Sequence, residues 1–324
     1  MTFNTALHQL QQSEDIAIIT HVQPDGDAIG SCLALADILE RAGKKKVTLY
    51  CQDKVPALLE FLHGHQKFKN SLEDGQQFDL SIAVDCSDEN RMGTCFAVFK
   101  AGKKSMNIDH HVSNTFYADT NLVDIKAAAT GEIIYRIGKE LTDNLGKHSA
   151  EALYTAISTD TGSFCFRNTT AQSYRIASEL IEIGIDIERV TTLLYKTNRL
   201  ERIRLLAKAL SSLELFENNK IAVITITQRD LTSTGAMESE MENMVNYAKN
   251  IVGVEIGILL KEADDSTSKI SLRSKGRIDV SLLAGQFGGG GHQAAAGASL
   301  PMDVEQARKE VLAAARKMLG AGTQ

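Results

Sequence analysis

Short apolar runs alternate with a longer segment of helical periodicity between residues 15 and 99. Apolar runs occupy residues 16–19, 47–50 and 79–84, and residues 28–41 carry apolar side chains on one helical face. Apolar runs of this length, separated by amphipathic helices, are typical of parallel strands with helices on the faces of the sheet. The pattern therefore predicts an α/β fold with a mostly parallel sheet.

The pattern becomes helical after residue 127, and residues 185–213 have the periodicity of a helical connector. A second α/β unit with a closing helix at about residues 304–319 follows. Its strand-like runs lie at residues 221–227, 252–260 and 268–272. We therefore predict a larger N-terminal α/β domain, a helical connector and a smaller C-terminal α/β domain, spanning residues 1–185, 186–214 and 215–324.

Length, charge and cysteine content limit the classes of function. A chain of 324 residues has room for about two domains. Its 35 basic and 41 acidic residues give a net charge of −6, which argues against a surface for long duplex nucleic acid. The five scattered cysteines predict neither a disulfide framework nor a thiolate zinc site. No apolar run approaches the ~18 residues of a membrane-spanning helix, and residues 1–16 lack a signal-peptide pattern, so we expect a cytoplasmic protein with no membrane partner.

Three of the predicted strands are each followed by Asp or His side chains. They are His21, Asp25 and Asp27 after the run at 16–19, Asp85 after the run at 79–84, and Asp109, His110 and His111 after a run at 105–108. The carboxyl ends of parallel strands meet at one edge of the sheet, where such folds bind ligands. Asp and His suit a divalent cation such as manganese. A turn and a helix cap would also explain Asp25 and Asp27 taken alone.

Asp160 follows a further stretch of helical periodicity and precedes Gly162. Taken alone, this segment has the pattern of a helix C-terminus that is closed by a glycine. Taken with the other three segments, Asp160 is predicted to be the closing ligand of a two-metal site. Paired metal ions clamp the attacking and leaving oxygens of a phosphoester displacement and lower the pKa of bound water.

The second unit carries a candidate phosphate-binding segment. Consecutive glycines allow the backbone to approach an anion closely, and an arginine on a neighbouring strand binds phosphate oxygens in pairs. A flexible hinge would also explain the glycines, and a solvated strand edge would explain the basic residues Lys269, Lys275 and Arg277. The predicted substrate-binding residues are Arg273, Gly288, Gly289, Gly290, Gly291 and His292.

These segments together resemble a known family. The set His21-x-x-Pro-Asp25-x-Asp27, Val84-Asp85, Asp109-His110-His111 and Thr159-Asp160-Thr-Gly-Ser-Phe resembles, in order, the four motifs of the DHH phosphoesterase superfamily. In the second unit, Ser271-Leu-Arg273-Ser and the segment Gly-Gly-Gly-Gly-His-Gln-Ala-Ala-Ala-Gly look like its DHHA1 domain. Within the superfamily, the chain length and residues 109–132 are most similar to the small bacterial nanoRNase type, which are bifunctional oligoribonucleases and adenosine 3',5'-bisphosphate (pAp) phosphatases.

The resemblance implies a set of residue roles. His21, Asp25 and Asp85 would hold one manganese ion, and Asp85 would bridge to a second ion. The ligands of that second ion would be Asp27, Asp85, His110 and Asp160. His111 would lie beside the site as a catalytic residue, contacting the substrate phosphate or donating a proton to the leaving oxygen.

The expected function is therefore that of a phosphoric ester hydrolase that requires two divalent metal ions, with manganese as the expected metal. It would degrade very short RNA to 5'-mononucleotides and remove the 3'-phosphate from adenosine 3',5'-bisphosphate. One alternative is a phosphodiesterase for cyclic or linear dinucleotides in nucleotide signalling, and another is a non-catalytic nucleotide sensor. The expected partners are short RNA or a nucleotide bisphosphate as substrate, and a second copy of the chain in a possible homodimer.

Overall fold

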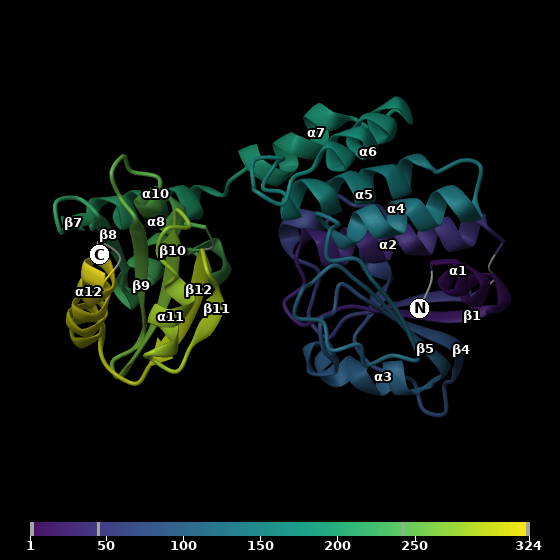
Figure 1. The fold of residues 1–324 in the computed structure, drawn as a ribbon, viewed down its shortest axis with the longest axis horizontal. Coiled ribbons are helices and arrows are strands. Elements are labelled where there is room, and N and C mark those ends of the chain that lie inside the picture. The colour runs from purple at the N-terminus through teal and green to yellow at the C-terminus, as the bar shows by residue number, and fades with distance from the viewer. Residues whose placement is uncertain (1–2, 44–45, 242, 322–324) are drawn as a thin grey trace. The chain divides into compact units, whose positions relative to one another are not determined.

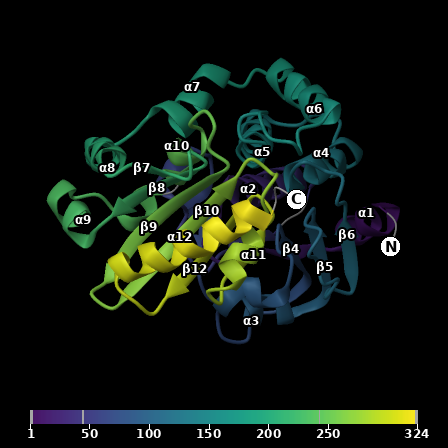
Figure 2. The same cartoon turned by 60° about the vertical axis from the view of Figure 1, so that its left-hand side comes forward.

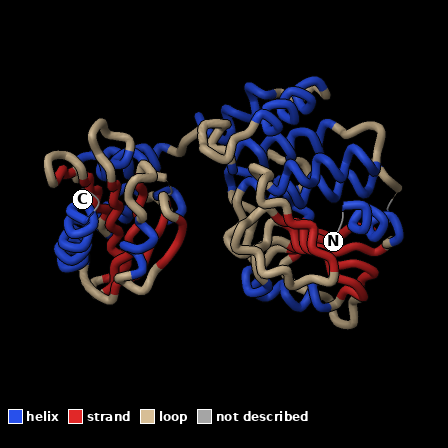
Figure 3. The backbone as a smooth tube through the Cα atoms, viewed as in Figure 1, coloured by secondary structure: helices blue, strands red, loops and turns tan. Residues whose placement is uncertain are grey.

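The computed structural model describes residues 3–43, 46–241 and 243–321. The chain divides into two compact units, Met1–Thr197 and Asn198–Gln324, each with its own sheet and core (Figure 1). Figure 3 shows the strands gathered into one sheet in each unit, with helices around them. No helix among the described residues is both long enough and apolar enough to cross a membrane.

The first unit is built on a six-stranded parallel sheet of strand order β3-β2-β1-β4-β5-β6. Its strands are β1 (Asp15–Ile19), β2 (Lys46–Tyr50), β3 (Phe68–Lys69), β4 (Phe78–Val84), β5 (Gly102–Asp109) and β6 (Thr120–Val123). The order places β1, β4 and β5 side by side, so that their carboxyl ends meet at one edge. The predicted mostly parallel α/β fold is confirmed.

Helices cover both faces of this sheet because its strands are apolar on both sides. Ile16 and Ile18 face a core shared with α1, α2, α4, α5 and α6, whereas Ala17 and Ile19 face a smaller core with α3. The helices are α1 (Phe3–Gln12), α2 (Gly26–Arg41), α3 (Phe96–Lys100), α4 (Thr130–Leu141), α5 (Lys147–Asp160), α6 (Ala171–Glu182) and α7 (Ile187–Thr191). A Cβ at Gly30 would lie 2.5 Å from the carbonyl oxygen of Ala152, so this glycine allows the close packing of α2 on α5.

Short helical turns complete the first unit. Three of them are 3-10 helices and one is a π-helix: η1 (Ala57–Leu59), η2 (His65–Lys67), η3 (Glu89–Cys95) and η4 (Thr192–Lys196). The η3 turn follows β4 directly, which carries its residues toward the sheet edge where β1, β4 and β5 end.

The second unit contains a mixed six-stranded sheet of order β11-β12-β10-β9-β8-β7, in which only β8 and β9 run parallel. Its strands are β7 (Glu214–Phe216), β8 (Ile221–Ile226), β9 (Ile256–Asp264), β10 (Thr267–Ser274), β11 (Gly290–His292) and β12 (Ala295–Leu300). Its helices are α8 (Leu200–Ser211), α9 (Gln228–Thr234), η5 (Glu238–Met241), α10 (Val245–Lys249), α11 (Val280–Gly285) and α12 (Val304–Ala321). Helices α11 and α12 pack on one face and α8 and α10 on the other (Figure 2).

The elements of the second unit depart from the sequence-based expectations at three places. The strand expected from residue 252 begins at Ile256, because Gly253 has a left-handed φ of 85° that a strand does not accommodate. Residues 214–216, for which the sequence predicted no strand, form β7. Gly290 and Gly291, also outside the predicted strands, belong to β11, which pairs with β12. The closing helix is confirmed as α12.

Candidate metal centre

Loops at the carboxyl ends of neighbouring strands bring the predicted metal ligands together. His21 follows β1, Asp85 follows β4, and His110 follows β5. Asp27 lies in the first turn of α2, and Asp160 is the last residue of α5. The convergence expected from the sequence is therefore found at the edge where three parallel strands end.

The imidazole and carboxylate groups form interlocking sets whose ligand atoms lie within 4.8 Å of one another. These sets are His21–Asp25–Asp85, Asp27–His110–Asp160 and Asp85–His110–His111. Nε2 of His110 is 3.8 Å from Oδ2 of Asp27, 3.8 Å from Oδ1 of Asp85 and 3.6 Å from Oδ2 of Asp160. These separations exceed hydrogen-bond length and approach the spacing of ligands that each lie about 2 Å from a shared ion.

Asp85 is placed between two of these sets. Its Oδ2 lies 3.6 Å from Nε2 of His21, and its Oδ1 lies 3.8 Å from Nε2 of His110. The side chain is almost fully buried, and its backbone has a left-handed φ of 57°, which is unusual for a non-glycine residue. Backbone strain of this kind persists where the surrounding structure fixes a functional group. Each oxygen of Asp85 thus faces a different histidine.

The carboxylates of the centre have divergent pKa values. Burial opposes ionisation of Asp85, but His21, His111 and His110 outweigh it and lower the pKa of Asp85 to about 2. Burial and then the negative charges of Asp85 and Asp160 raise the pKa of Asp27 well above its usual range. Burial and Asp85 raise the pKa of Asp160 to about 6, against the effect of His110. Several carboxylates share a space that accepts little negative charge, which is the condition that a bound cation relieves.

The first residues of α4 hold two of these carboxylates, Asp27 through backbone amides and Asp85 through a hydroxyl. Oδ2 of Asp27 accepts a hydrogen bond of 2.7 Å from the amide of Thr130, and Oδ1 accepts one of 3.0 Å from the amide of Gly131. The hydroxyl of Thr130 donates to Oδ1 of Asp85 at 2.8 Å. Thr130 and Gly131 received no role from the sequence. Their signals in it are the start of the helical pattern and their place in residues 109–132, which carry part of the family resemblance.

Two structural roles that the sequence offered for the ligand segments, a helix cap at Asp25 and a glycine-closed helix end at Gly162, are present together with the metal-centre geometry. Asp25 caps α2, because its Oδ1 accepts from the amide of Ala28 at 3.0 Å, yet its exposed side chain also lies within the His21–Asp85 set. Gly162 follows α5 with a left-handed φ of 55°, as a glycine-closed helix predicts. Ser163 and Phe164 are also left-handed, so the loop after Asp160 is strained over consecutive residues.

Asp109, the first residue of the Asp-His-His segment, contacts the second histidine. Its buried Oδ1 accepts from Nδ1 of His111 at 2.8 Å, and its Oδ2 accepts from Nδ2 of Asn114 at 2.5 Å. The hydrogen bond between Asp109 and His111 is the main cause that raises the pKa of His111 to about 9. Asp109 therefore fixes the orientation of His111 and favours its protonated form.

Arg91, in η3, contacts His21 of the candidate centre. Its Nη2 lies 3.1 Å from Nδ1 of His21, and the same Nδ1 lies 2.8 Å from the carbonyl oxygen of Val22. When Nδ1 donates its proton to the carbonyl of Val22, Nε2 is free to ligate a metal, and the guanidinium of Arg91, which only donates, lies beside Nδ1 without a hydrogen bond to it. Arg91 received no role from the sequence.

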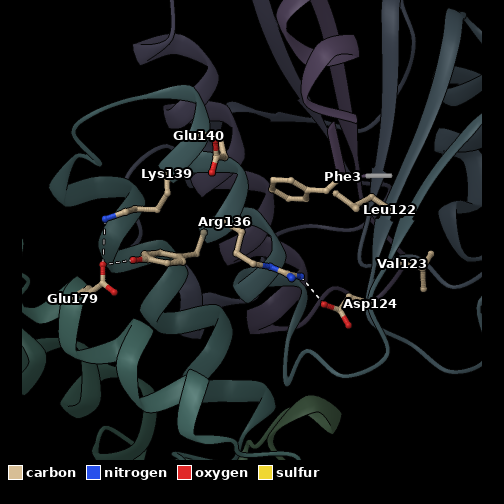
Figure 4. Close-up of a pocket in the computed structure, with 9 residues that line it drawn as sticks. Phe3, Leu122, Val123, Asp124, Arg136, Lys139, Glu140 and Glu179 are labelled. Carbon is tan, nitrogen blue, oxygen red and sulfur yellow. Dashed lines mark hydrogen bonds and ion pairs between the residues drawn. The ribbon is translucent and has the colours of Figure 1, made fainter. Parts of the chain in front are cut away.

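A hollow of about 580 Å³ lies elsewhere in the first unit (Figure 4). It is lined by residues of α1, β6, α4 and α6, none of which belongs to the candidate ligand sets. Arg136 is paired with Asp124 at 2.6 Å, and Lys139 with Glu179 at 3.2 Å. Because protein carboxylates already neutralise these cations, the hollow does not have the character of a phosphate site.

The predicted substrate-binding residues lie on β10, on β11 and in the turn before β11. Arg273 is on β10 and His292 is on β11. A Cβ at Gly289 would collide with the carbonyl oxygen of Gly297, and a Cβ at Gly291 would lie 2.5 Å from the carbonyl oxygen of Ala295. These two glycines are thus required where the turn and β11 approach β12. A free hinge does not describe this segment.

Comparison with known proteins gives matches over both units. Residues 15–157 match the DHH family, N-terminal domain, and residues 218–321 match the DHHA1 domain. The chain is 32% identical over 310 residues to a Thermus thermophilus protein named bifunctional oligoribonuclease and PAP phosphatase NrnA, covering 94% of this chain and 90% of the relative. A Bacillus subtilis protein of the same name is 32% identical over 290 residues, covering 89% and 90%.

A solved structure also matches almost the entire chain. It is that of an exopolyphosphatase-related protein from Bacteroides fragilis, with a TM-score of 0.91 and 27% sequence identity. The match covers 99% of this chain and 97% of that one. Both the fold and the order of the elements are therefore similar along the whole length.

Proposed function

Because this chain belongs to the DHH family and is a phosphoric ester hydrolase, we propose that it acts on very short RNA and on adenosine 3',5'-bisphosphate. It would release 5'-mononucleotides from the RNA and remove the 3'-phosphate of the bisphosphate. The observation that carries the proposal is a similarity to the bifunctional enzymes that spans both units, joined to a set of acidic and imidazole ligands at one sheet edge.

The residues at this edge fit a pair of divalent cations. Carboxylates with raised pKa values, Asp27 buried and Asp160 partly buried, lie next to imidazole nitrogens, which is a donor set that manganese accepts. We propose that His21, Asp25 and Asp85 hold one cation, and that Asp27, Asp85, His110 and Asp160 hold the other. When bound, two such ions would neutralise charge on the phosphoryl oxygens and lower the pKa of the attacking water.

His111 would complete the chemistry from beside the ions. Its Nδ1 is occupied by Asp109, and its raised pKa keeps the ring protonated near neutral pH. Nε2 would then donate a hydrogen bond to a phosphoryl oxygen or a proton to the leaving alcohol. Asp109 has the part of a positioning residue, since it acts through His111.

The test is product analysis with the purified chain and manganese. Adenosine 3',5'-bisphosphate, a ribodinucleotide, a longer RNA and a cyclic dinucleotide are offered in parallel, and products are separated by chromatography. We expect rapid cleavage of the first two and slow cleavage of the longer RNA. Cleavage of the cyclic dinucleotide alone would replace the proposal with a signalling phosphodiesterase, and binding without any cleavage would replace it with a nucleotide sensor.

Further parts of the expectation stay predictions with their own tests. Reloading the metal-free chain with manganese, magnesium, cobalt or zinc tests the metal, and light scattering tests the homodimer. A cytoplasmic location is tested by cell fractionation. We also keep as a proposal the functional division into a catalytic part, a helical connector and a substrate-binding part at residues 1–185, 186–214 and 215–324.

A further inference from the structure

The register of the second sheet places four residues in one row across four strands. Arg273 on β10 pairs with Gly257 on β9 and with Ala295 on β12, and Ala295 pairs in turn with His292 on β11. Directly paired residues project to the same face of an antiparallel sheet. Arg273 and His292 therefore share a face, about 10 Å apart, with only the methyl group of Ala295 between them.

Lys249 joins this row at the position of Gly257. A Cβ at Gly257 would lie 2.6 Å from the backbone nitrogen of Lys249 and 2.9 Å from its Cα and Cβ. The last residue of α10 thus lies directly over Gly257, on the face that carries Arg273. Any other residue at 257 would push α10 away, so this glycine brings a second cation next to Arg273.

The charges that act on Lys249 are cationic. Burial, followed by the positive charges of Arg273 and Lys275, lowers the pKa of Lys249. Lys275 is held nearby, because its ammonium group donates to the carbonyl oxygen of Ile251 at 2.9 Å. Grouping cations on a half-buried surface costs free energy, because the cations repel one another and lose solvent. A bound anion would offset that cost.

We propose that Lys249 binds a phosphate of the nucleotide substrate together with Arg273, on the floor formed by Gly257 and Ala295. The two cations suit a terminal phosphate monoester, which carries up to two negative charges, better than an internal diester, which carries one. His292, at the far end of the row, has the reach to contact the same nucleotide. This assignment rests on the proposed function for its substrate class, and it adds Lys249 to the residues that the sequence indicated.

Lys269 offers a matched control. It lies on β10 four residues before Arg273, so it projects from the same face about 13 Å away, opposite Lys261. Lys269→Ala removes the same charge from the same sheet face but not from the row. Lys249→Arg keeps the charge at the proposed position, and it tests whether any cation there is sufficient to bind the phosphate.

The experiment titrates adenosine 5'-monophosphate into the full-length chain, kept metal-free with EDTA so that metal ions do not recruit the phosphate. Calorimetry should show that Lys249→Ala weakens binding about 10- to 100-fold, as expected for a lost charge-assisted contact. Lys249→Arg should lose less than about fivefold, and Lys269→Ala less than about twofold. Unchanged affinity in Lys249→Ala, or no binding by the wild-type chain, would overturn the proposal.

A kinetic comparison separates a contact with phosphate from a structural effect. With manganese, Lys249→Ala should raise KM for adenosine 3',5'-bisphosphate about tenfold or more with kcat nearly unchanged, and leave KM for adenosine 3'-monophosphate nearly unchanged. Because the proposed reaction removes the 3'-phosphate, the phosphate bound by Lys249 would be the 5'-phosphate. An equal rise in KM for both substrates would contradict that role. If the wild-type chain binds the monophosphate through Lys249 but cleaves neither substrate, the proposed function fails and the assignment of Lys249 stands.

Discussion

The candidate metal centre of the first unit and the row of Lys249, Arg273 and His292 in the second, called the cationic row below, are both polar sites on a sheet. They are built differently. The candidate metal centre takes its side chains from the segments after parallel strands and from the ends of two helices, α2 and α5. Other parts of the protein hold these side chains, as Thr130 holds Asp27 and Asp109 holds His111. The cationic row takes its side chains from strand register and from a helix end that rests on Gly257.

This difference matches what each site is proposed to bind. Ligation of a divalent ion needs fixed atoms with a narrow range of distances, so each ligand requires a further contact that orients it. Binding of a phosphate tolerates longer side chains, because the ammonium group of lysine on its flexible stem and the guanidinium of arginine can reach the phosphate oxygens from several directions. We therefore expect substitutions in the first site to abolish turnover, and substitutions in the second to change affinity.

The largest effect is expected for Asp85→Asn. One oxygen of Asp85 faces His21 and the other faces His110, so a neutral amide should disturb both ion positions. Turnover of adenosine 3',5'-bisphosphate should fall by about a thousandfold or more. Phosphate release measures the rate, and elemental analysis of the dialysed protein counts the bound metal.

The control for this variant is Asp79→Asn, on β4, the strand that Asp85 follows. Asp79 accepts hydrogen bonds from Lys103 and from the backbone amide of Asp15, and it belongs to none of the ligand sets. Its turnover should remain within about twofold of the wild type. An Asp85→Asn variant with more than about a tenth of wild-type activity would refute the bridging role.

Asp109→Asn is expected to have the next largest effect. The variant keeps the size of the side chain but loses the charge that orients and protonates His111, so kcat should fall about 10- to 100-fold. Asp119→Asn is the control, because Asp119 accepts from Ser105 outside the ligand sets. Equal activity in the two variants would show that Asp109 does not act through His111.

The same pair of residues gives a pH dependence of stability in the metal-free chain. The pKa of His111 is raised to about 9 from 6.5, so its contribution to stability is fully present below about pH 6.5 and is lost as the pH rises through 9. Chemical unfolding in EDTA should show that the wild type loses more stability than Asp109→Asn across this window. If the free energy of unfolding changes equally with pH in the two proteins, the charge of Asp109 is not the cause of this pH dependence.

The fold was largely predictable from the sequence because parallel strands covered on both faces are apolar throughout. The run at 16–19 shows this, since Ile16 and Ala17 are both buried but face different cores. The convergence of the candidate ligands could be predicted because most of them lie shortly after strands, and Asp160 lies at the end of a helix. Position along the chain was thus a good guide to position in space in the first unit.

The rest could not be predicted because it depends on contacts between distant segments. The amide of Thr130 reaches Asp27 across 103 positions of the chain, and Arg91 reaches His21 across 70. Lys249 gives no signal of its own, since its place beside Arg273 follows only from the pairing of Arg273 with Gly257. A sequence pattern shows which residues face one way along an element, but not what another element brings to them.

Arg91→Ala tests the contrast between the two sites, because Arg91 lies at the candidate metal centre but is a cation, like the residues of the second unit. Its guanidinium lies 3.1 Å from His21 and belongs to an exposed residue, so it is available to a phosphoryl oxygen. We expect KM to rise about tenfold with a smaller change in kcat. Arg175→Ala, an exposed arginine of α6, is the control, and a change confined to kcat would assign Arg91 to positioning His21 instead.

The smallest change in turnover is expected from the glycines before and within β11, where packing and phosphate binding make different predictions. A Cβ at Gly289 would collide with the carbonyl oxygen of Gly297, whereas in the described chain a Cβ at Gly290 would meet no atom within 4 Å. Gly289→Ala should therefore lower the free energy of unfolding by about 1–3 kcal/mol, and Gly290→Ala by less than about 1 kcal/mol. Because the folded fraction stays high in both, each should keep turnover within a few-fold of wild type at saturating substrate. If Gly290→Ala instead raises KM strongly without loss of stability, the open face of β11 contacts the nucleotide, and the row from Lys249 to His292 extends to the glycine segment.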